Sequence, residues 1–144
     1  MTNIFIAPAT PDDFEAIYGF VCALANEVFD RESMHGYYKQ CLSAPHHHYL
    51  MAFANDVPVG YISCHGQLLL HHGGMVYEIE ELYVEDKYRS MGIGRQLVRA
   101  IEDALAGSGL RSLEVCSNVK RTDAHRFYSN AGFRHTSFKF VKEL

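Results

Sequence analysis

The sequence predicts a single mixed α/β (α+β) domain over residues 1–144, with a mostly antiparallel central sheet and helices on its faces. Segments with alternating side chains and segments with apolar residues at helical spacing follow one another along the chain. The 144 residues suffice for one hydrophobic core and are too few for two. Hydrophobic residues make up 48% of the chain, and no repeat, linker or biased tract interrupts them, which is typical of a globular protein.

The N-terminal part predicts a strand and two helices. Residues 4–7 fit a short strand, and Thr10 and Asp13 then form a capping box with Pro11 at the first helical position. One apolar stripe at spacings of three and four predicts the helix that follows: Phe14, Ile17, Val21, Leu24 and Val28. A second short helix is expected over residues 33–42.

The middle of the chain predicts antiparallel strands. Residues 49–53 and 59–63 flank a turn at 55–56, and the second of these strands can run on toward Leu70. Residues 76–84 predict the next strand, after a glycine turn.

The C-terminal part predicts four elements in alternation. Apolar spacing indicates a helix over residues 92–105, and a strand over 112–116 follows it. A helix over 123–130 and a final strand over 133–141 complete the expected fold.

The strand over residues 76–84 is unusually acidic. Three of its residues carry carboxylates: Glu78, Glu80 and Glu81. Strict alternation would place Glu78 and Glu80 on one face and Glu81 on the other. Ile79 and Leu82 are three residues apart, however, and both suit the core. We therefore predict a β-bulge near Glu80 and Glu81, which would splay this strand from its neighbour in the middle of the sheet.

A glycine turn after the acidic strand is the most informative stretch. It reads Arg89-Ser90-Met91-Gly92-Ile93-Gly94-Arg95. Glycines let a ligand approach the backbone, and the free N–H groups at a helix start attract phosphate. A P-loop would need Lys-Ser or Lys-Thr after the glycines, and a dinucleotide fingerprint would need Gly or Ala in place of Leu97. Two interpretations of the turn remain at this point: a binding site for a phosphate-bearing ligand, and an ordinary helix start.

The turn fits the pattern Arg/Gln-x-x-Gly-x-Gly/Ala, and in this the chain resembles the GNAT superfamily of acetyl-CoA-dependent N-acetyltransferases. Residues 9–13 are typical of its first helix, and its later segment is matched by Asn118, Ala124, Phe127, Tyr128 and residues 131–133. Ala7 departs from the pattern, since many members carry Arg there. The resemblance covers nearly the whole chain and implies the same splayed sheet.

The resemblance implies acetyl-CoA as cosubstrate and a set of residues that bind it. The implied cofactor-binding residues are Leu82, Tyr83, Val84, Arg89, Ser90, Met91, Gly92, Ile93, Gly94, Arg95, Asn118, Ala124 and Phe127. Tyr128 matches the tyrosine beside the thioester sulfur, which implies that it protonates the leaving thiolate.

Within the superfamily the chain is similar to bacterial aminoalkylphosphonate N-acetyltransferases. Residues 70–72, 78–82 and 117–128 carry this similarity. It implies acetylation of a small aminoalkylphosphonic acid, with a divalent metal as activator. Two alternatives stay open: another small amine (a polyamine, amino acid or aminoglycoside) and a non-catalytic acyl-CoA-binding module.

Acetyl transfer to an amine requires a base. An alkyl ammonium of pKa about 10.4 is neutral in only about one molecule in 2,500 at pH 7. Among the carboxylates of the acidic strand, Glu78 is our first candidate for the base and Glu81 the second. Cys64 and Cys116 lack a His and acid arrangement around them, so we expect direct transfer in a ternary complex.

A phosphonate needs cationic partners. Lys120, Arg121 and His125 precede Tyr128 and could bind the substrate together with Glu81. The histidines at 46–48 and 71–72 are adjacent along the chain and so point different ways on a strand. They show no spacing typical of metal ligands, so metal ligands stay unassigned; a divalent ion could be held mainly by Glu78 and the phosphonate.

Composition also bears on partners. A net charge of −4 disfavours nucleic acid, and no apolar run approaches the roughly 20 residues that span a bilayer. The widely spaced cysteines and the lack of a signal-like N-terminus indicate a cytoplasmic protein. The superfamily resemblance implies a homodimer.

Overall fold

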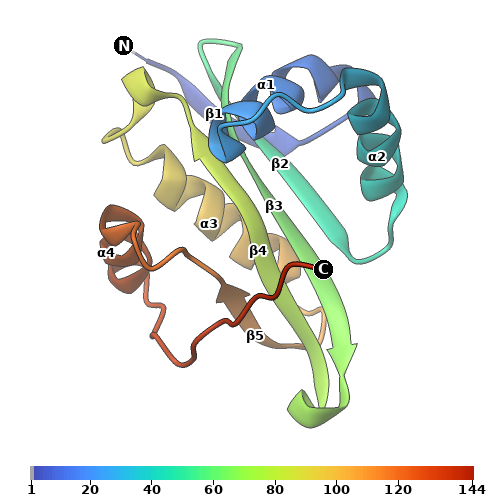
Figure 1. Cartoon of the computed structure of the whole chain (residues 1–144). Helices are drawn as coiled ribbons and strands as arrows, with labels where there is room; N and C mark the ends of the chain where they lie inside the picture. The colour runs from blue at the N-terminus through green and yellow to red at the C-terminus, as the bar shows by residue number, and fades with distance from the viewer. Residues whose placement is uncertain (1) are drawn as a thin grey trace.

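A central sheet organises the molecule. The computed structural model describes residues 2–144, and these form a five-stranded sheet in the order β1-β2-β3-β4-β5 (Figure 1). The strands are β1 Ile4–Pro8, β2 His47–Ala54, β3 Val57–Leu69, β4 Gly74–Val84 and β5 Leu110–Val115. All neighbours are antiparallel except β4 and β5, which run parallel. The predicted mixed, mostly antiparallel sheet is confirmed.

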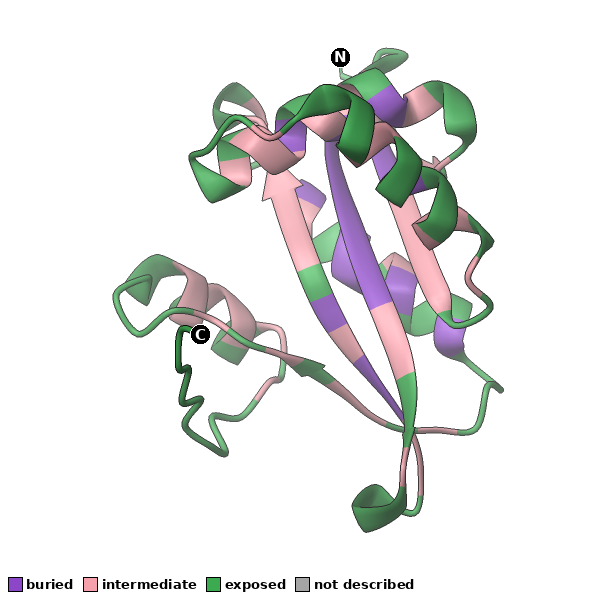
Figure 2. Ribbon diagram, turned by 45° about the vertical axis from the view of Figure 1, so that its right-hand side comes forward, coloured by how far each residue is buried: buried purple, intermediate pink, exposed green. Residues whose placement is uncertain are grey.

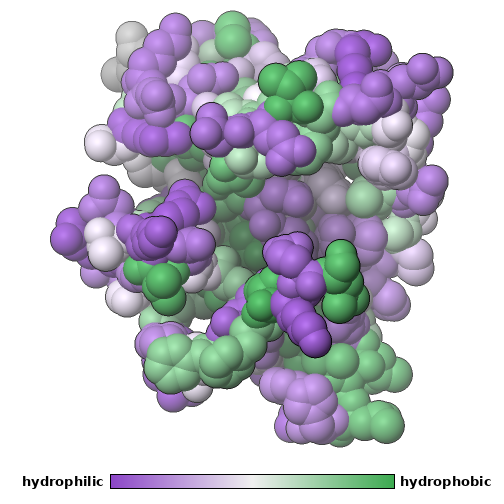
Figure 3. Space-filling view, in the orientation of Figure 1, coloured by the Kyte–Doolittle hydropathy of each residue, from purple (hydrophilic) through white to green (hydrophobic). Residues whose placement is uncertain are grey.

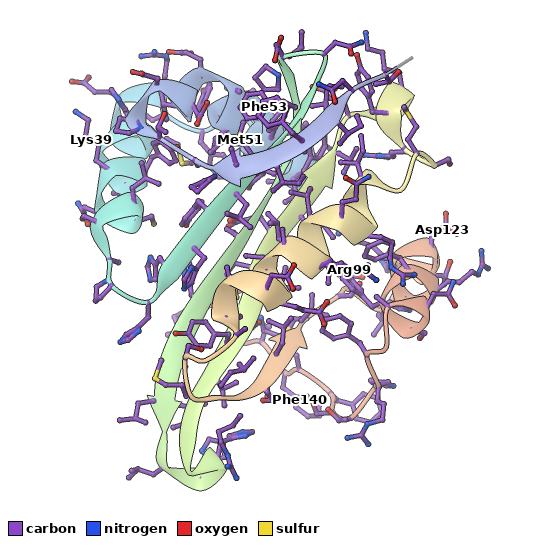
Figure 4. All side chains as sticks on the ribbon, turned by 180° about the vertical axis from the view of Figure 1, so that it is seen from behind. Lys39, Met51, Phe53, Arg99, Asp123 and Phe140 are labelled. Carbon is purple, nitrogen blue, oxygen red and sulfur yellow. The ribbon has the colours of Figure 1, made fainter. Side chains whose placement is uncertain are left out.

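Helices cover both faces of this sheet. They are α1 Phe14–Ala25, α2 Arg31–Ser43, α3 Ile93–Leu105 and α4 Thr122–Asn130, with short 3-10 turns η1 Pro11–Asp13, η2 Leu70–His72 and η3 Asp86–Tyr88. Helices α1 and α2 pack on one face, and α3, which links the parallel strands, lies across the other with α4 near it (Figures 1 and 4). Within the described residues, no helix combines the length and apolarity needed to cross a membrane.

Two hydrophobic clusters fix these layers. The α3 face is built on the stripe that the sequence predicts, with buried Ile93, Leu97, Ile101 and Leu105 against the sheet. On the opposite face Phe14, Ile17 and Phe20 of α1 join buried residues of α2 and the central strands. Each such side chain contributes about 1.5–3 kcal/mol by leaving water. Figure 2 shows the buried residues concentrated in the central strands between the helix layers.

The first helix is shorter than its apolar stripe suggests. The predicted capping box is present: the Thr10 hydroxyl accepts from the Asp12 N–H, and the Asp13 carboxylate accepts from the Thr10 N–H. The helix ends at Ala25, and Asn26 caps it in a left-handed conformation with φ of 53°. Val28 is therefore 86% exposed, and its assignment to the stripe is wrong, because the chain turns away before reaching it.

The predicted bulge is present in β4. Ser63 pairs with Glu81 and Cys64 pairs with Ile79, so Glu80 is an extra residue with no partner in β3. As a result Ile79 and Leu82 both reach the α3 cluster. The bulge also keeps Glu78 and Glu81 on the α1–α2 face, whereas strict alternation would separate them.

The expected final strand over residues 133–141 is wrong. The described chain has no regular structure after Asn130, and Phe138 and Phe140 are 75% and 92% exposed. In Figure 4 Phe140 lies at the margin of the molecule, beyond β5. Alternating aromatic residues favour a strand only where one face can be buried, and this segment covers no apolar surface with them.

Candidate active site

Strands β4 and β5, the last pair in the strand order, separate partway along their length. Their pairing runs from Met75 to Ile79 of β4 and ends at Val115 of β5, just before the bulge. The opening is a hollow of about 220 Å³, lined by Leu24, Ile79, Glu80, Glu81, Leu82, Val115, Cys116, Arg121 and Tyr128. Figure 3 shows the molecule hollowed at its centre in this view. A slot between diverging strands can admit an extended ligand, which here could bond to the free edge of β4.

The glycine turn presents backbone amides at the start of α3. Gly92 has φ of 79°, which favours glycine, and no side chain caps the helix. The helix's first intrahelical bond joins the Gln96 N–H to the Gly92 carbonyl over 3.1 Å. In this part of the described chain, the amides of residues 93–95 are thus left for an external acceptor. A diphosphate fits this arrangement.

Gly94 holds α4 against α3. A Cβ at this position would lie 3.2 Å from the Phe127 ring, so the missing side chain lets that ring pack against the backbone. Phe127 also contacts Tyr128 edge to face, with ring centroids 5.3 Å apart. The glycine turn and Tyr128 are therefore coupled through one aromatic side chain.

Arg89 is bound within its own loop. Its Nε donates to the Val84 carbonyl over 2.9 Å, and its guanidinium lies 2.8 Å from the Asp86 carboxylate. Ser90 beside it has φ of 69°, a conformation that costs a non-glycine residue about 1 kcal/mol or more. The loop is thus shaped by its own side chains before any ligand binds.

Tyr128 lines the hollow together with Arg121. Burial raises the pKa of the Tyr128 phenol, and the nearby Arg121 charge lowers it, with burial the larger effect. The phenol is therefore protonated at neutral pH, as a proton donor must be.

Glu81 is tied to β3. The Ser63 hydroxyl donates to its carboxylate, and the Glu81 N–H donates to the Ser63 oxygen over 3.1 Å. Buried Tyr61 lies close by; burial and the Glu81 charge raise its pKa. Within the described residues the Tyr61 hydroxyl has no hydrogen-bond partner. Glu81 thus belongs to a polar group inside the α1–α2 layer.

Glu80, the bulge residue, joins two hollows. Besides the first hollow it lines a second one of about 180 Å³, together with His47, His65, Gly66, Gln67, Leu69, Val76, Glu78 and Glu114. Burial and the charges of Glu78 and Glu81 raise the pKa of Glu80, and Lys139 lowers it. Glu80 is thus more basic than an ordinary carboxylate and lies at the junction of both hollows.

Four titratable residues form a row across the second hollow. His47 of β2 pairs with His65 of β3, His65 with Glu78 of β4, and Glu78 with Glu114 of β5. Burial and the His47 charge lower the pKa of His65, while the Glu78 charge raises it. Glu78 therefore lies among ionisable neighbours from three other strands.

The predicted substrate-binding residues separate into two groups. Glu81 and Arg121 line the first hollow. Lys120 and His125 are absent from the described lining of both hollows and instead order the loop before α4. The Lys120 N–H donates to the Asn118 side chain over 2.9 Å, and the His125 ring bonds to the Asn118 carbonyl over 2.8 Å.

Sequence reasoning missed several residues that line these hollows. Glu114 and His65 enter through strand register, and Lys139 approaches Glu80 and Cys116 from the irregular C-terminal segment. The predicted strands over 76–84 and 112–116 each carry an acidic residue, and this shared feature is the signal that could have indicated Glu114. No local signal indicates Lys139, because its approach follows from the path of the segment beyond α4.

A glycine-opened helix start beside a splayed parallel strand pair, with carboxylates and a half-buried tyrosine in the opening, is compatible with a coenzyme A-dependent acyl transferase. The sequence pattern of the acetyltransferase (GNAT) family matches residues 13–133. The chain belongs to this family and is an acetyl-CoA-dependent N-acetyltransferase.

One relative is named for its substrate. The chain is 36% identical over 136 residues to aminoalkylphosphonate N-acetyltransferase of Salmonella typhimurium, covering 94% of this chain and 88% of that protein.

Two solved structures match the fold. Aminoglycoside N-acetyltransferase AAC(6')-Iy in complex with CoA has a TM-score of 0.90 at 18% identity and covers 100% and 96% of the two chains. A transcriptional regulator from Bacillus halodurans has a TM-score of 0.89 at 21% identity, covering 99% and 100%. Their different names show that this fold alone does not fix a function.

Proposed function

We propose that the acceptor is the primary amine of a small aminoalkylphosphonic acid. The observation that carries this proposal is the 36% identity, over nearly the full length, to an enzyme named for such substrates. The charges around the hollows support it. Carboxylates gather at Glu78, Glu80 and Glu114 to attract an ammonium, and Arg121 lies across the first hollow as a partner for an anionic group. Lys120 and His125 line neither hollow; Lys120 lies in the loop before α4 and His125 in the first turns of that helix.

Acetyl-CoA is the cosubstrate, and it supplies the activated acetyl group. We propose that the amides of residues 93–95 bind its diphosphate and that the open edge of β4 at Leu82, Tyr83 and Val84 orients its arm. The remaining residues proposed to surround it are Arg89, Ser90, Met91, Gly92, Asn118, Ala124 and Phe127.

Glu78 is our first candidate for the base. The Ser63 hydroxyl donates a hydrogen bond to the Glu81 carboxylate and holds it against β3. Glu78 lacks that restraint and lies beside two carboxylates, Glu80 and Glu114, in the second hollow. Glu80, with its raised pKa, is the second candidate, ahead of Glu81. The base takes one proton from the ammonium, directly or through water.

Tyr128 completes the transfer as the proton donor. Its phenol lines the opening where the thioester would lie, and its proton would pass to the leaving sulfur. A phenol of pKa about 10 or above is a weak acid toward a thiolate of pKa about 8.5, so its position matters more than its acidity.

A panel of amines tests the substrate. Thiol release from acetyl-CoA is measured with aminomethylphosphonate, glycine as its carboxylate analogue, a polyamine and an aminoglycoside. We expect at least about tenfold higher kcat/KM for the phosphonate than for glycine. Equal turnover of aminomethylphosphonate and glycine would indicate that the substrate is another small amine. Binding of acetyl-CoA without transfer to any amine would favour a non-catalytic binding module.

Three further proposals accompany this function. Parallel assays with and without added Mg²⁺ or Mn²⁺ test whether a divalent ion held by Glu78 and the phosphonate assists turnover. The widely spaced cysteines support a reducing location, the cytoplasm. A homodimer, which the family resemblance implies, is tested by light scattering.

A further inference from the structure

Three side chains from separate elements converge beside the second hollow. They are Cys41 near the end of α2, His47 at the start of β2 and His65 in β3. One ligand atom of each, the cysteine sulfur and one nitrogen of each ring, lies within 4.8 Å of the other two. All three residues are half-buried, so the cluster is reachable from solvent.

The fold brings these residues together over a long stretch of sequence. Strand register places His47 directly opposite His65, and their rings stack with centroids 3.6 Å apart and planes 4° apart. The Tyr49 hydroxyl lies 2.9 Å from the Nε2 atom of His65 and orients that ring. Helix α2 ends at Ser43 and the chain returns at once as β2, which leaves Cys41 above the pair.

Two features indicate that the cluster lacks a partner. The Nδ1 atom of His47 is buried and, among the described residues, has no hydrogen-bond partner. A buried polar atom without a partner is destabilising, so a ligand there would be stabilising. The adjoining hollow also carries Glu78, Glu80 and Glu114, and no Lys or Arg is among its described lining residues. That environment favours a cation.

We propose that Cys41, His47 and His65 bind a transition-metal cation of the Zn²⁺ class. One thiolate and two imidazoles are ligands that Zn²⁺, Co²⁺ and Ni²⁺ accept, whereas Mg²⁺ and Ca²⁺ prefer oxygen. Binding releases the Cys41 thiol proton to solvent. Three protein ligands leave a fourth position open, and the second hollow lies next to it.

Binding requires a side-chain movement. The lone pairs of two parallel stacked rings do not converge on one point, so one ring must turn. His47 is the ring that turns, because its Nδ1 atom makes no hydrogen bond, whereas Tyr49 holds His65. The torsion between Cβ and the ring is broad in histidine, which makes this movement inexpensive. Metal binding would thus separate the stacked rings.

Cobalt absorption tests the site without reference to acetyl transfer. The full chain, free of any histidine tag, is dialysed against a chelator and titrated with Co²⁺. We expect one equivalent to produce a thiolate-to-cobalt charge-transfer band in the near ultraviolet and visible bands of tetrahedral intensity. Zn²⁺ should abolish both bands, and Mg²⁺ should leave them unchanged.

Single variants assign the ligands. Cys41→Ser should remove the charge-transfer band, and His47→Ala and His65→Ala should each weaken Co²⁺ binding by at least about 100-fold, since even outer-shell changes cost 10- to 100-fold. Cys22→Ser and His46→Ala are matched controls, because Cys22 lies on α1 and exposed His46 adjoins His47 outside the cluster. Both should bind as the parent does.

The proposal fails if the parent chain gives no charge-transfer band, or if the control variants lose binding as the ligand variants do. Should Cys41→Ser not fold, the band in the parent chain still decides the question. Since the titration contains no acetyl-CoA and no amine, its outcome is independent of the proposed acceptor.

Discussion

The two sides of the proposed site are built in different ways. The proposed cofactor side, at the β4–β5 opening, is one continuous segment, in which Gly92 and Gly94 expose backbone amides at the start of α3. The proposed acceptor side, at the second hollow, is a row of side chains from four strands, including His65, Glu78 and Glu114. Binding by backbone amides is little affected by substitution of neighbouring side chains. Binding or catalysis by side chains is lost when the side chain that performs it is replaced. We expect mutations on the two sides to have different kinetic signatures.

The largest expected effect is on the acceptor side. Glu78→Gln removes the proposed base, so kcat should fall about 10²- to 10³-fold while acetyl-CoA binds as before. Steady-state kinetics and calorimetry with coenzyme A measure the two quantities. Glu114→Gln, in the same row, is the matched control and should lower kcat far less. Equal losses of kcat in both variants would mean that the carboxylates of this row act only through their combined negative charge.

Tyr128→Phe should have the next largest effect. The leaving thiolate then lacks its donor, and we expect kcat to fall about 10- to 100-fold with little change in the KM for acetyl-CoA. The phenol's raised pKa places its loss of the proton above pH 10, so the alkaline limb of the parent's pH–rate profile, rather than the neutral plateau, should depend on it. Unchanged kcat in the variant would exclude Tyr128 as the acid.

On the cofactor side, Gly92→Ala should act on binding. Its φ of 79° costs alanine about 1 kcal/mol, and relaxation of the turn should raise the KM for acetyl-CoA about tenfold with a smaller change in kcat. Gly107, with φ of 82°, is the matched control after α3. Gly107→Ala should lose similar stability in thermal unfolding and keep its KM; a raised KM in both would point to general destabilisation.

The smallest expected effect concerns stability and pH. The pKa of Glu80 is raised on folding, so its contribution to stability is full below the unfolded pKa of about 4.3 and is lost as pH rises through the folded value. At pH 7 Glu80→Gln should therefore be more stable than the parent. The gain should be under about 1 kcal/mol, because solvent screens this exposed group. Thermal melts at pH 7 and pH 4 measure it, and a gain that persists at pH 4 would contradict this origin.

The sequence predicts local features of the fold well. The Thr10 cap, the α3 stripe and the bulge at Glu80 all depend on residues within a few positions of one another. The strand expected over 133–141 failed because its formation depends on a surface elsewhere that would bury Phe138 and Phe140.

The same limit applies to the site. The glycine turn is contiguous, so its pattern is visible in the sequence. The contact between His47 and His65 arises only from the register of β2 on β3, so the sequence shows His47 only beside its chain neighbours. Lys139 reaches the opening through an irregular segment, for which periodicity gives no signal.

The extra residue in β4 has a consequence for the gene. Before Glu80 the core-facing side chains of β4 have odd numbers, as at Tyr77 and Ile79; after it they have even numbers, as at Leu82 and Val84. Deleting one codon at Glu80 would restore uniform parity and keep every core residue facing inward. With uniform parity we expect β4 and β5 to continue pairing beyond Ile79 and Val115, which would close the opening proposed as the site of acetyl transfer.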